Sequence, residues 1–126
     1  MARIRILVAL LLSVTAAACA TEPSGPQATP QVFALCANCH TTGPGGKDLV
    51  GPNLAGLFQR RAGSKPGYDY SDGLAQATFA WDDAKLDRWL ENPQAFIPGA
   101  RMYVRVESAG ERAAVIAYLH RATVAL

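Results

Sequence analysis

The segment Cys36-Ala37-Asn38-Cys39-His40 constrains the fold of this chain more than any other feature of its sequence. It places two thiols and one imidazole close together along the chain. These side chains in this pattern are typical of three kinds of site: a redox-active disulfide, a zinc centre and a covalent haem attachment. Each kind of site requires different secondary structure and different further ligands in the rest of the chain. The kind of site that the sequence favours therefore also predicts the fold class.

The rest of the sequence favours the haem attachment. A thioredoxin-like pair of Cys36 and Cys39 requires a βαβ context, and no convincing run of strand residues flanks the motif. Zinc requires two further ligands at sensible spacing, and His120, the one other histidine, lies on a helix much later. A Cys-x-x-Cys-His motif for c-type haem uses all three side chains. On the motif alone, zinc or a chance match stays an alternative.

The chemistry of attachment explains the spacing of the motif. Two thiols add to the two vinyl groups on one edge of a porphyrin and form thioether bonds. Because residues three apart lie on adjacent turns of a helix, Cys36 and Cys39 match that edge. His40 follows directly and is carried beneath the macrocycle, where its imidazole binds iron.

Hydrophobic periodicity predicts an all-α domain with three main helices and long loops rich in glycine and proline. The first helix begins at Thr29-Pro30, a capping residue followed by proline at the first helical position. The second begins at Asp82 or Asp83 and stops at Pro93. The third begins at the capping box from Ser108 to Glu111.

Each predicted helix has an apolar face, and Ser71 is expected to cap one more short helix. The apolar positions are Val32, Phe33, Leu35, Cys36 and Cys39 on the first helix, Leu86, Trp89 and Leu90 on the second, and Val115, Tyr118, Leu119 and Ala122 on the third. Tyr118 and Val115 are expected to pack against Val32. A domain this small with so much loop has a thin core, so the haem is expected to complete it.

A second axial ligand is available in the segment "IPGARMYV". A lone methionine is usually a core residue. Met102, however, lies in a loop opened by Pro98-Gly99, outside every predicted apolar stripe, and Met1 is lost with the expected signal segment. The sequence therefore favours Met102 as the sixth ligand, and a thioether in that position raises the reduction potential of the iron.

Taken together, these motifs resemble the class I cytochromes c of the short-chain respiratory type found in mitochondria and bacteria. The resemblance runs from about Thr29 to Thr123. It is carried in order by "CANCH", "GPNLAGLFQRRAGSKPGYDYSD", "WDDAKLDRWLENPQAFIPGARM" and "RAAVIAYLHRAT". It implies the all-α class I cytochrome c fold around one covalently bound haem c. It also implies a one-electron carrier and no enzymatic activity, because both axial positions of the iron are filled.

The resemblance implies roles for individual residues. His40 is the proximal ligand, with its other ring nitrogen bonded to the carbonyl of Pro52, and Met102 is the distal ligand. Trp89 lies near the methionine sulfur, where the family commonly has tyrosine. A buried haem propionate without partners is unfavourable. Its expected hydrogen-bond donors are Arg60, Tyr70 and Trp81.

Several residues depart from the family pattern. Ala28 and Val32 replace a glycine and an aromatic residue of the first helix, so the crossing of the terminal helices is expected to be looser or shifted. Ala100 stands where a hydroxyl residue often contacts the propionate. Gln94 and Ala95 replace lysines that face partners in the mitochondrial type. The remaining candidates for steering a partner are Lys47, Arg61, Lys65, Arg101 and Arg105.

The N-terminal residues predict export. Residues 1–18 comprise a short basic opening and an apolar run that is too short to span a membrane, as in a signal peptide. The run before Cys19 resembles a bacterial lipobox, with Ala16 where leucine is usual, so Cys19 is the expected lipidation site and ordinary cleavage is the alternative. Residues 19–29 form a tether rich in Pro, Gly, Ser and Thr, and residues 30–126 form the haem domain.

The charge pattern gives no indication of a nucleic-acid partner, and none is expected. Loss of Arg3 and Arg5 with the signal reduces twelve basic side chains to ten, equal to the ten acidic ones, and Arg60-Arg61 is the longest basic cluster. The expected location is the periplasmic side of a bacterial membrane, with the chain monomeric and anchored. The expected partners are a cytochrome bc-type donor and a terminal oxidase or reaction centre as acceptor. Two alternatives are an electron-accepting subunit of a periplasmic dehydrogenase and, in another class, a haem peroxidase or ligand sensor.

Overall fold

The computed structural model describes residues 28–124, which form short helices joined by long loops. The helices are α1 (Phe33–Ala37), the 3₁₀ turn η1 (Leu57–Gln59), α2 (Asp72–Ala75), α3 (Asp83–Glu91), α4 (Pro93–Phe96) and α5 (Ala109–Ala122). Within the described residues there is no strand, only an isolated bridge between Arg61 and Ala80. The predicted all-α class is confirmed. The expected signal segment 1–18, Cys19 and all but the last two residues of the tether 19–29 lie outside the described residues.

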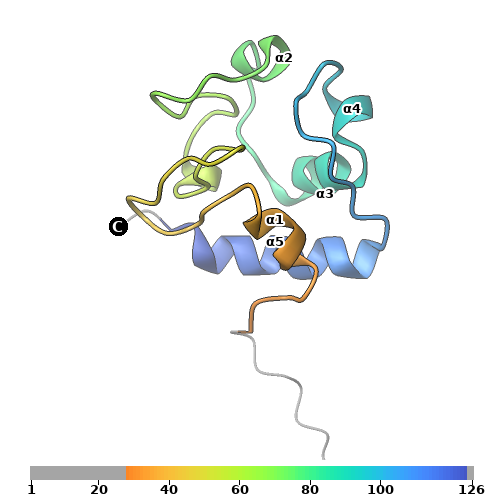
Figure 1. Ribbon diagram of the computed structural model, residues 1–126. Coiled ribbons are helices and arrows are strands. Elements are labelled where there is room, and N and C mark those ends of the chain that lie inside the picture. The colour runs from red at the N-terminus through yellow and green to blue at the C-terminus, as the bar shows by residue number, and fades with distance from the viewer. Residues whose placement is uncertain (1–27, 125–126) are drawn as a thin grey trace, which may run out of the picture.

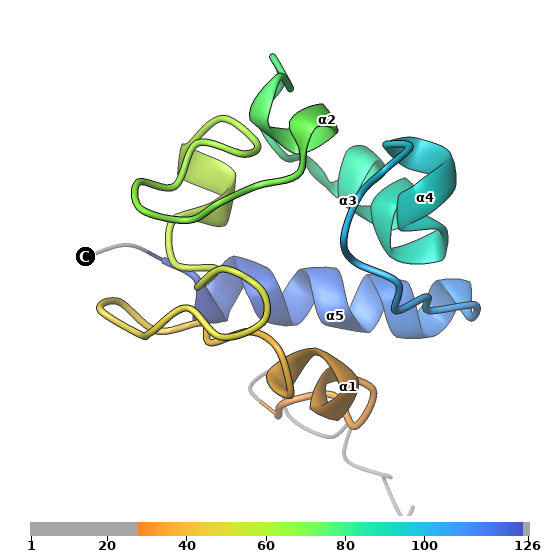
Figure 2. The same ribbon diagram turned by 45° about the horizontal axis from the view of Figure 1, so that its top comes forward.

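The longest helix, α5, forms the base of the fold, and the other elements are arranged around the space above it (Figure 1). Helix α1 lies alongside α5, and α3 packs against both α5 and α4 (Figure 2). The loops of residues 41–70 lie on the side away from α4, and helix α2 lies at the top between these loops and α4, where Gly73 packs closely against Ile97. This arrangement brings residues from every part of the domain around one space.

The caps predicted for the second and third helices are confirmed. The Asp82 carboxylate accepts a hydrogen bond from the Lys85 backbone N–H at 2.8 Å, and Ser108 Oγ accepts one from the Glu111 N–H at 3.4 Å. Beyond α3 the sequence analysis expected a loop, but Pro93 begins helix α4, whose N-cap Asn92 accepts a hydrogen bond from the Ala95 N–H. Proline suits the first helical position because its missing N–H has no partner there.

The predicted start of the first helix is wrong. Helix α1 begins at Phe33, and Thr29 does not cap it. Tight turns precede it instead, in which the Phe33 N–H donates to the Pro30 carbonyl at 2.9 Å. The ring of Phe33 lies against Tyr118, with centroids 4.5 Å apart, and Val32 is also packed against the core cluster that contains Val115. The expected shift of the terminal-helix contact is therefore a shift of the aromatic residue by one position along the chain.

Arg112 on α5 is a buried cation that joins three parts of the fold. Its side chain is only 8 % exposed. Its Nε donates to the Asp87 carboxylate of α3 at 2.7 Å, and one terminal nitrogen donates to the carbonyls of Val106 and Glu107 at 3.1 and 2.8 Å. Arg112 therefore ties α5 to α3 and to the segment that contains Met102, because that segment ends at Val106.

We expect Arg112→Met to lower the melting temperature of the haem-loaded protein by roughly 10 °C. The substitution leaves one buried carbonyl, one partly buried carbonyl and one carboxylate without their donor. Arg121→Met on the exposed side of the same helix is the control, with an expected change of about 2 °C or less. Thermal unfolding followed by circular dichroism measures both, and equal shifts would contradict the role of the buried contacts.

Candidate functional site

A cavity of about 570 Å³ lies within the ring of elements above α5. This volume is within the range of small-molecule and cofactor sites, roughly 300–1,000 Å³. Its lining is mainly apolar and includes Leu57, Leu86, Leu90, Val115 and Leu119. Nine residues that the sequence analysis singled out all line it: Cys36, Cys39, His40, Pro52, Arg60, Tyr70, Trp81, Trp89 and Met102. The tenth, Cys19, lies outside the described residues.

The Cys-x-x-Cys-His motif begins in the last turn of α1 and continues beyond it, and its cysteines and histidine line the cavity. The N–H groups of Cys39 and His40 both donate to the Cys36 carbonyl, at 3.0 and 2.9 Å. This continues the helical winding after Ala37 and brings all three side chains to the same wall. Burial raises the pKa of the Cys36 thiol. A buried thiol that stays protonated in this way is typical of a structural rather than a reactive cysteine.

His40 is held with one nitrogen free. Its Nδ1 lies 2.8 Å from the Pro52 carbonyl, which only accepts, so Nδ1 carries the proton and Nε2 keeps its lone pair. Burial lowers the pKa of His40 and favours the neutral ring. The ring lies directly against Gly51, where a Cβ would be 2.2 Å from His40 Cε1. A neutral imidazole in a fixed tautomer and orientation is suited to binding a metal.

Met102 reaches the same cavity from another part of the chain. It lies between α4 and α5, after a turn at Gly99, where the positive φ of 81° favours glycine. Figures 1 and 2 show this segment on the side of the fold away from the loop that follows α1. The segments that contain the two predicted axial ligands therefore lie on different sides of the fold, and both residues line one cavity.

One end of the cavity has hydrogen-bond donors without acceptors. Arg60 donates to Tyr70 Oη at 3.2 Å and to the Asn53 carbonyl at 3.4 Å, but its buried Nε has no partner among the described residues. The buried Ser71 Oγ also lacks one within residues 28–124. Buried polar groups without partners are rare in native proteins. Because Arg60 and Ser71 both line the cavity, a carboxylate bound there would satisfy both.

Ser71 is a site residue that the sequence analysis missed. It was interpreted as a helix cap, and it does precede α2, but its side chain makes no capping hydrogen bond. A serine before a short helix is normally explained by capping, so the sequence carried no separate signal for a ligand. Trp81 and Trp89 form the aromatic wall beyond it, with ring centroids 5.5 Å apart.

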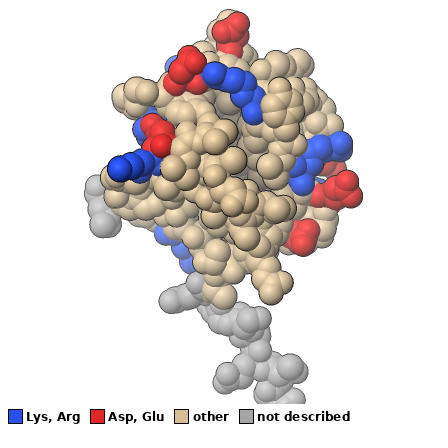
Figure 3. Space-filling view, viewed as in Figure 1, with Lys and Arg blue, Asp and Glu red and all other residues tan. Residues whose placement is uncertain are grey.

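The surface around the cavity carries little free charge. In Figure 3 the charged side chains lie toward the edge of this face and its middle is uncharged. Four of the five cations expected to steer a partner make contacts within the fold: Lys65 pairs with Asp48 at 2.9 Å, Arg101 pairs with Asp69 at 3.2 Å, and Arg61 and Arg105 donate to backbone carbonyls. Large apolar side chains at the mouth are partly exposed, among them Leu35, Val50 and Tyr103.

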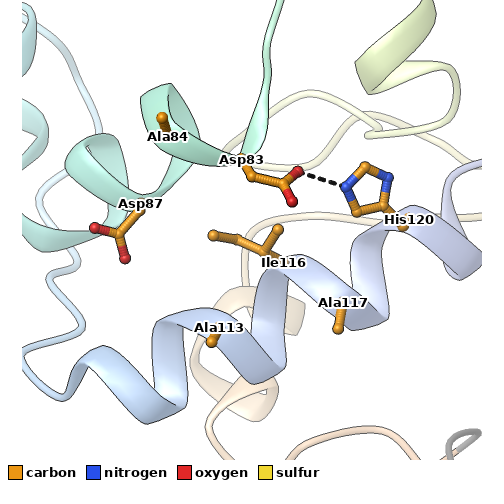
Figure 4. Close-up of a pocket in the computed structure, with 7 residues that line it drawn as sticks. All are labelled: Asp83, Ala84, Asp87, Ala113, Ile116, Ala117 and His120. Atoms are coloured by element: carbon orange, nitrogen blue, oxygen red, sulfur yellow. Dashed lines mark hydrogen bonds and ion pairs between the residues drawn. The ribbon is translucent and has the colours of Figure 1, made fainter.

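The second histidine lies in a different place. His120 lines a separate, open depression between α3 and α5, where its Nε2 lies 2.6 Å from the Asp83 carboxylate (Figure 4). Its ring also stacks on Phe58, with centroids 3.9 Å apart. His120 is not among the residues that line the large cavity. It is therefore not placed to act as a distal base, in agreement with its expected surface position.

Asp48 stabilises the loop that presents Pro52 to His40. Its carboxylate accepts from the Lys65 ammonium at 2.9 Å and from the Asn53 N–H at 2.7 Å, and these bonds lower its pKa. Because the folded state binds this proton less tightly than the unfolded state, Asp48 stabilises the fold above the unfolded pKa. That stability is lost as the pH falls through the folded pKa.

We therefore expect Asp48→Asn to destabilise the protein at neutral pH and to have less effect below about pH 4. Denaturant unfolding of both proteins across this range measures the difference. Asp72→Asn, at an exposed acidic position on α2, is the control and should show no such trend. A difference between wild type and Asp48→Asn that stays constant with pH would contradict the assignment.

Comparison with known proteins agrees with this geometry. The family model described as Cytochrome c matches residues 27–123. The chain is 44% identical to cytochrome c2 of Rhodomicrobium vannielii over 90 residues, which cover 71% of this chain and 72% of the relative. It is 39% identical to cytochrome c of Ginkgo biloba over 103 residues, covering 80% and 91%. Cytochrome c2 iso-2 of Magnetospirillum fulvum is 40% identical over 91 residues, covering 71% and 94%.

The match spans nearly all of the described residues, including every segment that lines the cavity. No helix within residues 28–124 has the length and apolar character needed to cross a membrane. The donor set and the mainly apolar lining of the cavity fit a c-type haem, as the sequence predicted. The chain belongs to the cytochrome c family, whose members carry electrons on a covalently bound c-type haem.

Proposed function

We propose that this protein carries single electrons on a haem c attached through Cys36 and Cys39, with His40 and Met102 as axial ligands. The observation that supports the proposal is the cavity itself, which His40 and Met102 line from separate segments together with the two cysteines. The bound haem supplies reversible one-electron chemistry at its iron. The protein holds the group, excludes water and keeps both axial positions filled.

The polar end of the cavity is proposed to bind a haem propionate. Arg60 and Ser71 supply the unpartnered Nε and Oγ, and Tyr70 lies against the guanidinium. Trp81 is proposed as a further donor through its indole N–H. Trp89, whose indole donates but does not accept, is proposed to lie near the methionine sulfur. A charged donor on a buried carboxylate offsets the cost of removing that carboxylate from water.

The proposed partners are membrane complexes of electron transport, with a cytochrome bc-type donor and a terminal oxidase or a reaction centre as acceptor. A mouth with partly exposed apolar side chains and few free charges suits brief docking that depends weakly on salt. Export to the periplasmic side of a bacterial membrane and lipidation of Cys19 remain part of the proposal, as does a monomeric state. A tether would supply local concentration in place of long-range steering.

Two other functions of a haem protein differ from this one in the partner or in the distal side of the site. An electron-accepting subunit of a periplasmic dehydrogenase would use the same chemistry and differ only in its partner. A haem peroxidase or ligand sensor needs an open distal position and a polar base. Met102 lines the cavity and His120 does not, so the absence of enzymatic activity is part of the proposal.

Intact-mass spectrometry and visible spectroscopy of the protein purified from membranes test the proposal together. We expect one haem per chain, attached by two thioether bonds, and a low-spin ferric spectrum with the weak red absorption of methionine bound to iron. The same mass shows whether acyl chains are present on Cys19. A high-spin ferric spectrum with rapid binding of carbon monoxide by the reduced protein would support the enzyme or sensor class instead.

A further inference from the structure

The side chain of Gln94 is bonded to the segment that contains the proposed distal ligand. Gln94 is the second residue of α4, and its Nε2 donates to the backbone carbonyls of Ala100 and Met102, the latter at 3.1 Å. Carbonyl oxygens only accept, so the nitrogen of the amide must face them, and both of its N–H groups are used. One side chain therefore holds the backbone on both sides of Arg101.

Gln94 binds the backbone of Met102 from outside the cavity. Met102 lines the cavity and Gln94 does not, so the carbonyl of Met102 is bonded on the side away from the cavity that its side chain lines. Ala100 is 1 % exposed, and its N–H donates to the Ile97 carbonyl at 3.1 Å, which closes the turn at Gly99. The Gln94 amide thus fixes both the end of this turn and the backbone of the ligand residue.

The helix that carries Gln94 is packed into the fold at both ends. Helix α4 packs against α3, Pro93 at its start is buried, and Ile97 at its end is only 8 % exposed. The remaining contacts of the segment hold other residues: Arg101 bonds to Asp69 across the mouth, and the Val106 N–H donates to the Leu90 carbonyl at 2.8 Å. Among the described residues, Gln94 is the only side chain bonded to the backbone of Met102.

We infer that Gln94 is a positioning residue for electron transfer, which keeps the Met102 sulfur at the iron in both oxidation states. The inference rests on the proposed function, because it assumes Met102 as the distal ligand. A thioether binds ferric iron less strongly than ferrous iron. The oxidised protein therefore depends most on a backbone that holds the sulfur in place. Loss of the two bonds frees the segment to move away and admits an external ligand.

Competition by imidazole in the full-length ferric haem protein tests the inference. We expect Gln94→Leu to bind imidazole about tenfold more tightly than wild type, because each hydrogen bond contributes modestly and a tenfold change corresponds to about 1.4 kcal/mol. The red absorption of the methionine bond should weaken in parallel. Gln94→Glu, which keeps the size but has no N–H, should shift in the same direction.

Ala95→Leu is the matched control, because Ala95 is an exposed neighbour on the same helix and its side chain makes no bond to the segment. We expect its imidazole affinity to equal that of wild type. Unchanged affinity in both Gln94 variants, or an equal change in Ala95→Leu, overturns the inference while leaving Met102 as the ligand. A wild-type ferric spectrum without the methionine absorption overturns the proposed ligation and this inference with it.

Discussion

Met102→Ala is expected to lower the reduction potential by roughly 0.2 V or more, because axial-ligand identity sets haem potentials over a range of about 0.8 V. Removal of the thioether takes away the ligand that favours reduced iron and opens the cavity to water. The ferric spectrum should become high-spin, and the reduced protein should bind carbon monoxide. Equilibrium redox titration followed by visible absorption measures the potential.

Tyr103→Ala is the control for this substitution. Tyr103 is the next residue, and its side chain is 75% exposed, so its loss tests whether any change in the segment has the same effect. We expect a potential close to wild type and no binding of carbon monoxide. If Met102→Ala also retained the wild-type potential and a low-spin spectrum, another residue would be the distal ligand and the proposed carrier function would lose its main support.

The double variant Cys36→Ser, Cys39→Ser, purified free of haem, is expected to be largely unfolded. At about 24 cal/mol per Å³, leaving a cavity of about 570 Å³ unfilled would cost at most about 14 kcal/mol. Domains of this size are stable by about 5–15 kcal/mol in total. Even a part of this limit is a large fraction of the whole stability of the fold, so far-UV circular dichroism should show little helix.

Cys19→Ser is the matched control, because it makes the same chemical change outside the motif. We expect this variant to keep its haem and the helix content of the wild type. Cooperative thermal unfolding of haem-free double variant with native-like circular dichroism would contradict the view that the prosthetic group completes the core. It would also require apolar contacts around α3 and α5 to be sufficient without it.

Local sequence signals predicted the local features well. The caps at Asp82 and Ser108 and the loop around Met102 all follow from residues adjacent in the chain, and all are present. Helix α1 was predicted to begin too early, because Thr29-Pro30 is a good start signal that the tight turns before Phe33 override. Helix α4 was missed, because Pro93 ends one helix and begins the next within two residues.

Long-range contacts could not be predicted in the same way. The sequence analysis made no prediction for Arg112. It lies on the same helix face as Val115 and Leu119, and its acceptors come from α3 and from the segment near Val106. Gln94 was noted only as a replaced lysine, and its bonds to the carbonyls of Ala100 and Met102 depend on the turn at Gly99. Charge and residue type do not reveal partners that are brought together only by folding.

The sequence by itself predicted the kind of cofactor, which the family match confirms, and it suggested the proposed attachment residues and axial ligands. A five-residue motif and a methionine in a Pro-Gly loop restrict the chemistry before any fold is known. The tertiary structure alone decided which polar atoms meet at the end of the cavity, notably the unpartnered Arg60 Nε and Ser71 Oγ. The physical reason is that a motif acts through neighbours along the chain, whereas burial and hydrogen bonding depend on neighbours in space.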